Sequence, residues 1–201
     1  MTRVRRSLAP YRPRRATLRD GRQVTLRAVR PDDAGEIVQA FERLSPESRY
    51  LRFMQHKREL DPQVLARGVD PVPGREFALV ATVPADDGYD IVGAARYVAS
   101  AQPSTCEFSI TVADDWRGVG LATTLLRRLM LRARRDGYRA IEGLVLAENL
   151  PMLALARQLG FEVLPVAGDA TVCTVRRALR RAQRKAAVRG TTGQMRSHRG
   201  R

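Results

Sequence analysis

The hydrophobic positions of this chain follow two periods, and the changes between them divide the chain into strands and helices. Residues 24–29 alternate apolar and polar side chains as a half-buried strand does, and this pattern ends before Pro31. Pro31, Asp32 and Asp33 suit the first turn of a helix, because proline fits there and carboxylates favour its positive end. Apolar residues then recur at helical spacing over residues 34–44, and two shorter helices are predicted at 45–53 and 61–65.

The rest of the chain alternates strands with longer helices. An amphipathic helix is predicted over 119–135, with leucines on one face and arginines on the other, and a second helix over 149–159 that ends at Gly160. The predicted strands are residues 77–83, 91–98, 105–112, 140–146, 162–164 and 170–175. The first two are joined by a connection of hairpin length. The order is therefore one strand, three helices, three antiparallel-type strands, helix, strand, helix and two closing strands.

Composition predicts one folded domain between two basic ends. The chain has 201 residues, 44% of them hydrophobic, and a formal charge of +15. Residues 1–20 hold seven Arg and one Asp, and residues 176–201 hold ten Lys or Arg and no acid, so the two ends carry +16. We therefore expect a basic disordered tail at 1–20, a folded domain at 21–177, and a basic extension at 178–201 that is partly helical and then disordered.

The basic ends allow two interpretations. They could bind nucleic acid, anionic lipid or acidic protein surfaces through charge. They could equally be solvated extensions in an arginine-rich protein, because 34 of the 36 basic residues are Arg. No aromatic residue interrupts the C-terminal basic run, so the stacking pattern of single-strand binders is missing there. The favoured interpretation is the solvated extension, with weak nucleic-acid contact left open.

Cysteine and hydropathy set the compartment that we expect. Cys106 and Cys173 are too few for a disulfide framework or a metal site, and only His56 and His198 could add imidazole ligands. The prediction is two structural thiols, no metal and a reducing compartment. No signal-peptide core and no apolar run of about 18 residues is present, which predicts a cytoplasmic protein without a membrane span.

The loop between the strand at 105–112 and the following helix is the first candidate for chemistry. It contains Arg117-Gly118-Val119-Gly120-Leu121-Ala122. Two glycines let the backbone approach a ligand closely, and the first N–H groups of a helix have no internal partner and favour an anion. The loop alone predicts either a phosphate site or a plain structural turn.

This loop resembles the Arg/Gln-x-x-Gly-x-Gly/Ala loop of the GNAT (Gcn5-related) acyl-CoA N-acetyltransferases. Glu148-Asn149 and the run Ala-Leu-Ala-Arg-Gln-Leu-Gly-Phe at 154–161 are similar to a later helix of that family, so the resemblance covers about residues 22–177. It implies an α/β (α+β) GNAT fold with a central mixed, mostly antiparallel sheet of about seven strands flanked by helices. The run at 44–53 further resembles bacterial protein lysine acetyltransferases that act on acyl-CoA synthetases.

The resemblance also implies acetyl-CoA as co-substrate and a set of residues that bind it. The backbone of Val112 would contact the pantetheine and donate an N–H to the thioester carbonyl oxygen, a role compatible with an ordinary core valine. The N–H groups of the loop and of the helix start would hold the diphosphate. The expected cofactor-binding residues are Val112, Arg117, Gly118, Val119, Gly120, Leu121, Ala122, Thr123 and Asn149.

Glu107 is the candidate catalytic residue. Strand alternation places Glu107 on the face of Ser109 and Thr111, opposite Cys106 and Phe108. An alkylammonium acceptor must lose a proton before it attacks, and the family places a Glu on this strand as general base. The alternative is a structural ion pair between Glu107 and Arg96 on the neighbouring strand.

One position departs from the family pattern. Many GNAT enzymes carry a proton-donating Tyr seven residues after the Asn of the later helix, and Ala156 stands there in this chain. The CoA thiolate would then leave unassisted, or with help from Tyr138 or water.

The expected function is acetyl transfer from acetyl-CoA to a primary amine in a ternary complex, with a protein lysine as the expected acceptor. A small amine is the first alternative. The second is a non-catalytic acyl-CoA-sensing protein that binds nucleic acid through its tails. A homodimer is left open.

Overall fold

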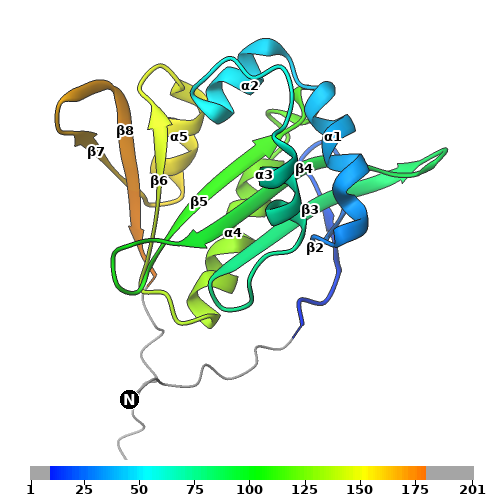
Figure 1. Ribbon diagram of the computed structural model, residues 1–201, viewed down its shortest axis with the longest axis horizontal. Coiled ribbons are helices and arrows are strands. Elements are labelled where there is room, and N and C mark those ends of the chain that lie inside the picture. Colours follow the sequence, from blue (N-terminus) through cyan, green and yellow to red (C-terminus); the bar gives the residue numbers. More distant parts are fainter. Residues whose placement is uncertain (1–9, 180–201) are drawn as a thin grey trace, which may run out of the picture.

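One eight-stranded sheet, in the order β1-β2-β3-β4-β5-β6-β8-β7, forms the centre of the computed structural model, which describes residues 10–179 (Figure 1). The strands are β1 (Arg14–Thr17), β2 (Gln23–Ala28), β3 (Glu76–Ala85), β4 (Gly88–Ala99), β5 (Thr105–Val112), β6 (Ala140–Leu146), β7 (Glu162–Val166) and β8 (Asp169–Ala178). The helices are α1 (Ala34–Glu42), α2 (Pro46–Phe53), α3 (Pro62–Val69), α4 (Leu121–Arg135) and α5 (Leu150–Gln158), with short 3₁₀ turns η1 (Pro31–Asp33) and η2 (Asp114–Trp116).

The sheet is mixed and mostly antiparallel, as predicted, and it has one parallel contact. β5 pairs with β6 in parallel only at the first three residues of each strand, from Thr105 opposite Ala140 to Glu107 opposite Glu142. Beyond Glu107 the two strands diverge, and Figure 1 shows them spreading apart toward the end of the sheet where α2 lies. This divergence leaves part of the β5 edge without a strand partner.

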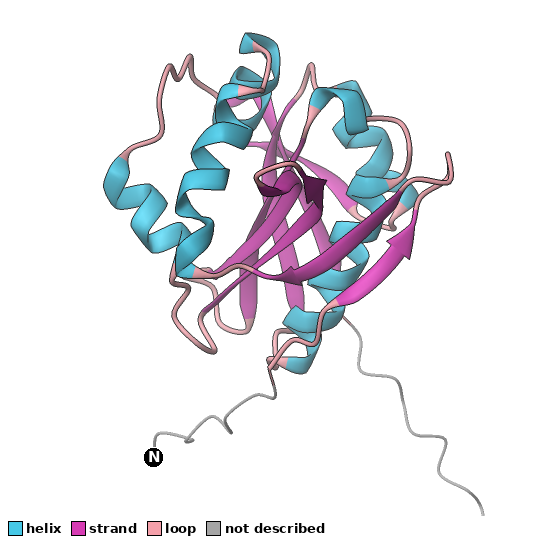
Figure 2. Ribbon diagram, turned by 90° about the vertical axis from the view of Figure 1, so that its right-hand side faces the viewer, coloured by secondary structure: helices cyan, strands magenta, loops and turns pink. Residues whose placement is uncertain are grey.

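Helices cover both faces of the sheet, as Figure 2 shows. The main core lies between the sheet and α4, whose residues Leu121, Leu125, Leu126 and Leu129 have no exposed surface. Each such leucine contributes about 1.5–3 kcal/mol by leaving water. The arginines Arg127, Arg134 and Arg135 of α4 are exposed, so the amphipathic pattern oriented this helix correctly.

The N-terminal boundary predicted at residue 20 is wrong. Residues Arg14–Thr17 form β1, which pairs antiparallel with β2 from Arg14 opposite Leu26 to Thr17 opposite Gln23. Leu18 follows it and is buried. An edge strand is held by backbone hydrogen bonds, and its Arg-rich sequence hid it from a search for apolar alternation. This strand raises the count from about seven to eight.

The C-terminal prediction changes less. β8 extends to Ala178, so residue 178, predicted to begin the basic extension, is instead the last residue of a strand. The predicted helical and disordered parts of that extension lie outside the described residues, as does the start of the N-terminal tail.

The two cysteines are unpaired and Cys106 is fully buried, where burial raises the pKa of its thiol to about 12. Among residues 10–179 no group of His, Cys, Asp and Glu side chains is arranged to hold a metal ion. No helix in this part of the chain has the length and apolarity needed to cross a membrane.

Candidate active site

A cavity of about 710 Å³ opens where β5 and β6 diverge. It is bounded by β5, the loop before α4, the start of α4, the end of β6, α5 and α2. Nine of the ten residues expected to form the site border this cavity: Glu107, Val112, Arg117, Gly118, Gly120, Leu121, Ala122, Thr123 and Asn149. The tenth, Val119, instead packs against the hydrophobic core. Residues far apart in sequence thus meet at one place.

β5 has the predicted alternation. Cys106 and Phe108 are buried in the core, whereas Glu107 is exposed and borders the cavity. Within residues 10–179, the side chain of Glu107 makes no hydrogen bond or ion pair. The alternative ion pair with Arg96 is wrong, because Arg96 Nη2 lies 2.8 Å from Glu76 Oε2 on the next strand. The carboxylate of Glu107 is therefore free to meet a ligand.

The backbone of Val112 faces the opening beside β5. The N–H of Ala113 donates to Val92 O at 3.0 Å, and the N–H of Ser100 donates to Thr105 O at 3.0 Å. In an antiparallel ladder, alternate residues bond the partner strand, so Ala113 and Thr105 set the phase for all of β5. Val112, which is opposite Gly93, therefore turns its N–H and C=O away from β4 and toward the space that β6 has left.

The loop before α4 presents a row of free donors. Gly118 and Gly120 have φ of +75° and +93°, conformations that glycine adopts without strain. Among the described residues, no acceptor is found for the N–H groups of Gly118, Gly120, Leu121, Ala122 and Thr123. They lie at the N-terminus of a helix of 15 residues, where the dipole favours an anion. The loop can thus bind a diphosphate through its backbone.

Arg19, which follows β1, braces this loop. Its Nη2 donates to Gly118 O at 3.0 Å, and its backbone N–H donates to Val119 O at 3.0 Å. A Cβ on Gly120 would lie 3.2 Å from Arg19 Nε. Arg22 also donates to Asp115 O at 3.1 Å and lies over the Trp116 ring. Arg19, which lies in the segment expected to be a tail, therefore supports the loop at residues 117–120, which is called the donor loop below because the acetyl donor is expected to bind there.

Asp114 connects the same loop to α2. It accepts hydrogen bonds from Ser45 N at 2.8 Å and from the hydroxyl of Ser48, and its carboxylate lies 2.9 Å from Arg117 Nη2. Burial favours a higher pKa for Asp114, but the hydrogen bonds from Ser48 and Ser45 and the charge of Arg117 outweigh it and lower the pKa. The side chain of Arg117 is thus engaged within the protein.

The second candidate element, α5, places Asn149 and Ala156 differently. Asn149 borders the cavity and caps the helix, because its side-chain oxygen accepts a hydrogen bond from Met152 N at 3.1 Å. This bond uses only the oxygen of the amide, so its NH₂ group can still donate. Ala156 is fully buried and does not border the cavity. Tyr138, the suggested substitute acid, is also buried and donates to Gly74 O and Arg75 O, away from the cavity. A role for Tyr138 in protonating the thiolate is therefore wrong.

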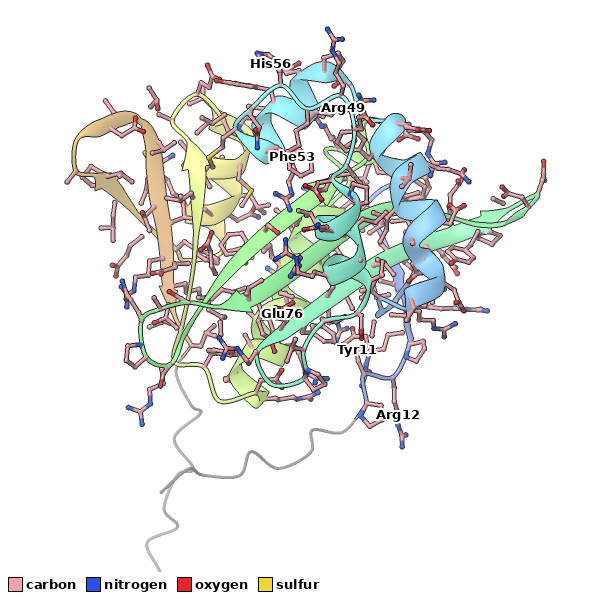
Figure 3. The ribbon with its side chains drawn as sticks, viewed as in Figure 1. Tyr11, Arg12, Arg49, Phe53, His56 and Glu76 are labelled. Carbon is pink, nitrogen blue, oxygen red and sulfur yellow. The ribbon has the colours of Figure 1, made fainter. Side chains whose placement is uncertain are left out.

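Among the residues that border the cavity, Arg19, Ser48 and Arg52 carry polar side chains that the sequence patterns did not assign to the site. Ser48 and Arg52 are four residues apart and thus share one face of α2. That spacing was visible in the sequence, but nothing in it showed that this polar face packs on β5. Figure 3 shows Phe53, the last residue of α2 and the neighbour of Arg52 in the sequence, on the side of the helix nearer the sheet.

Comparison with known proteins agrees with this geometry. The family model described as "Acetyltransferase (GNAT) domain" matches residues 23–162. Acetyltransferase PA5475 of Pseudomonas aeruginosa is 37% identical over 145 residues, which cover 72% of this chain and 78% of that protein. The chain belongs to the GNAT family and is an acetyltransferase.

Two solved structures share the fold. The GNAT domain of S. lividans PAT superposes with a TM-score of 0.75 and 25% identity, over 83% of this chain and 96% of that one. The acetyltransferase yncA from Salmonella typhimurium, solved with its cofactor acetyl-CoA, has a TM-score of 0.62 and 21% identity, over 82% of this chain and 98% of that one.

Proposed function

We propose that this enzyme transfers the acetyl group of acetyl-CoA to a primary amine in the cavity between β5 and β6. The observation that carries the proposal is the meeting of three groups there: the free N–H row of the donor loop, the unpaired backbone of Val112 and the unpaired carboxylate of Glu107. Each matches one part of the reaction. Acetyl-CoA is the co-substrate of the family, as the yncA complex illustrates.

The donor binds along one edge of the cavity. The N–H groups from Gly118 to Thr123 bind the diphosphate at the start of α4. The pantetheine then extends along the open edge of β5, where backbone groups that β6 does not use can pair with its amides. This arrangement takes the pantetheine past the backbone of Val112, at the end of the strand, and carries the thioester along β5 toward Glu107.

The chemical step uses two groups of β5. Glu107, directly or through a water molecule, accepts a proton from the acceptor ammonium, whose ordinary pKa is about 10.4. The amine nitrogen attacks the thioester carbon, and a backbone N–H on the open edge of β5, in phase with that of Val112, stabilises the oxygen as it becomes negative. The C–S bond then breaks, and the nitrogen gives its second proton to a water molecule in the cavity. The products are the N-acetyl amine and CoA, whose thiolate takes a proton from water.

The acceptor remains the finer part of the proposal. A protein lysine is the acceptor expected from the resemblance of residues 44–53. A small amine is the second candidate. One observation favours it: Arg52 borders the cavity and is bonded to Ser109, on the same face of β5 as Glu107.

The test of the base is Glu107→Gln, which keeps the size and removes the proton acceptor. We expect turnover at neutral pH to fall by about 10²–10⁴-fold, while acetyl-CoA affinity measured by calorimetry stays within a few-fold. Glu162→Gln, on the exposed edge strand β7, is the matched control and should keep full activity. Gly120→Trp fills the donor loop and should lose acetyl-CoA binding. An unchanged rate in Glu107→Gln would remove this residue from the base role.

A further inference from the structure

Arg52 is half-buried and, unlike Arg27 and Arg96 nearby, has no acid as its partner in the part of the chain that the structure describes. Its Nε donates to Thr111 Oγ1 and its Nη2 to Ser109 Oγ, both at 2.9 Å. In the part of the chain that the structure describes, no carboxylate lies within ion-pair distance of Arg52, and its Nη1 has no hydrogen-bond acceptor. Arg27 and Arg96, by contrast, pair with Asp33 and Glu76 at 2.7 and 2.8 Å.

The surroundings of Arg52 carry an excess of positive charge. Arg96 lies on β4 opposite Ser109, and its Nε is buried without a hydrogen-bond partner. Burial, followed by the charge of Arg96, lowers the pKa of Arg52 to about 10. Glu76 pairs with Arg96, so it does not compensate the charge of Arg52. A partly buried cation without an acid is costly to the fold unless something else compensates it.

Arg52 lies within a small molecule's reach of the proposed base. The two hydroxyl groups that accept hydrogen bonds from Arg52 belong to Ser109 and Thr111, which follow Glu107 on the same face of β5. Alternate residues on one face of a strand are about 7 Å apart along its axis. Arg52 also borders a second, smaller cavity of about 180 Å³, lined mostly by apolar side chains beneath α1, α2 and α3. Arg52 therefore lies at the junction of a reaction cavity and an apolar cavity.

We propose that Arg52 binds the carboxylate of the acceptor, and that the acceptor is a small amino acid whose amine and carboxylate are a few bonds apart. This inference rests on the proposed acetyl transfer. The amine would reach Glu107 while the carboxylate meets the free Nη1 of Arg52, and an apolar side chain would enter the smaller cavity. A guanidinium is suited to this role, because its planar donors match a carboxylate in pairs.

A purely structural role for Arg52 is the competing explanation, because its bonds to Ser109 and Thr111 attach α2 to β5. The two roles predict different substrate dependence. A structural link should affect all acceptors alike, whereas a carboxylate receptor should affect only acceptors that carry the carboxylate. The experiment therefore compares matched acceptors rather than total activity.

The probes are pairs that differ only in the carboxylate: L-methionine with 3-(methylthio)propylamine, L-leucine with isoamylamine, and L-phenylalanine with phenethylamine. A lysine peptide with blocked termini is the protein-type acceptor. Acetyl transfer is followed by release of the CoA thiol. We expect wild-type kcat/KM to favour the amino acid of at least one pair by about 10- to 100-fold, the range for a charge-assisted hydrogen bond.

The variant is Arg52→Met, which keeps an unbranched stem and removes the charged guanidinium. We expect it to abolish the preference by raising KM for the amino acid, with little change for the decarboxylated amine. Arg52→Lys should restore part of the preference, because it returns the charge without the planar donors. Thr111→Val removes one structural link but keeps the guanidinium, so it should retain the preference.

Three outcomes would overturn the inference: wild type without a carboxylate preference, transfer to the lysine peptide alone, or an equal loss for both members of each pair in Arg52→Met. Absence of transfer to any amine would contradict the proposed function itself. In that case, calorimetry of the same amino acids with the CoA-bound protein tests the role of Arg52 by binding alone. Binding to wild type that is lost in Arg52→Met supports the role of Arg52 as the carboxylate receptor. A wild type that does not bind the amino acids contradicts it.

Discussion

At the scale of single residues, Asp33 is a fully buried carboxylate outside the cavity that depends on its hydrogen-bond partners. It accepts hydrogen bonds from Nη2 and Nη1 of Arg27 at 2.7 and 2.8 Å, from the Tyr89 hydroxyl at 2.6 Å, and from Arg30 N at 2.7 Å. Burial favours a higher pKa for its carboxyl, but these hydrogen bonds and the Arg27 charge outweigh it, so the pKa is lowered. The sequence showed Asp33 only as a favourable charge at a helix start.

Asp33→Asn should therefore lower the free energy of unfolding at pH 7 by about 3–5 kcal/mol, because it leaves the buried Arg27 without its acid. A lowered pKa in the folded state gives stability that is present above the unfolded pKa of about 3.9 and is lost as pH falls through the folded pKa. The difference between wild type and variant should accordingly shrink below about pH 4. Urea unfolding at several pH values measures it, with the neighbouring exposed Asp32→Asn as control. A difference independent of pH would contradict this assignment.

At the scale of elements, the sequence predicted most helices and strands and the antiparallel pairing of the three middle strands, but not where the pairing of β5 with β6 ends. The amphipathic pattern of α4 and the alternation of β5 were both confirmed. The divergence of β6 from β5, which creates the cavity, was not predicted, because it depends on contacts between residues about 35 apart in sequence. Gly143 lies at this point on β6, directly after Glu142, which is the last residue of β6 that pairs with β5. A Cβ there would lie 2.9 Å from the Phe108 ring and 3.1 Å from its carbonyl oxygen.

Gly143→Ala should destabilise the fold by about 1–3 kcal/mol, the usual cost of overpacking. The ring cannot move aside easily, since Phe108 packs on Phe161 with ring centroids 5.4 Å apart. Gly35→Ala in α1 is the matched control, because a Cβ there meets nothing within 4 Å. It should leave stability unchanged or slightly higher. Denaturant unfolding compares the two, and equal stability would mean that the strands have room to adjust at Gly143.

At the scale of the whole molecule, the sequence located the donor side of the site better than the acceptor side. The donor loop is a local pattern in one turn and the helix that follows, so residues close together in sequence, such as Gly118 and Gly120, were enough to predict it. The acceptor side combines α2, β4 and β5, so Arg52 gains its meaning only from residues more than 40 positions away. The edge strand β1 escaped notice for a related reason, since its stability comes from pairing rather than from its own apolar pattern.

The distribution of charge leads to a prediction about the ends of the chain. Residues 1–9 and 180–201 hold 11 basic residues and no acid, whereas every residue that borders the reaction cavity lies between Arg19 and Gln158. Removing both ends should leave the acetyl-CoA dissociation constant within a few-fold. If the ends bind nucleic acid, the full chain should bind a DNA or RNA duplex with an affinity that falls steeply with salt, and the shortened chain should lose it. A deletion that extends through Arg22 should instead weaken acetyl-CoA binding, because it removes β1 and the Arg19 contacts to Gly118 and Val119. Calorimetry and salt-dependent binding on the three lengths separate these effects, and equal acetyl-CoA affinity in all three would show that the donor loop holds its shape without β1.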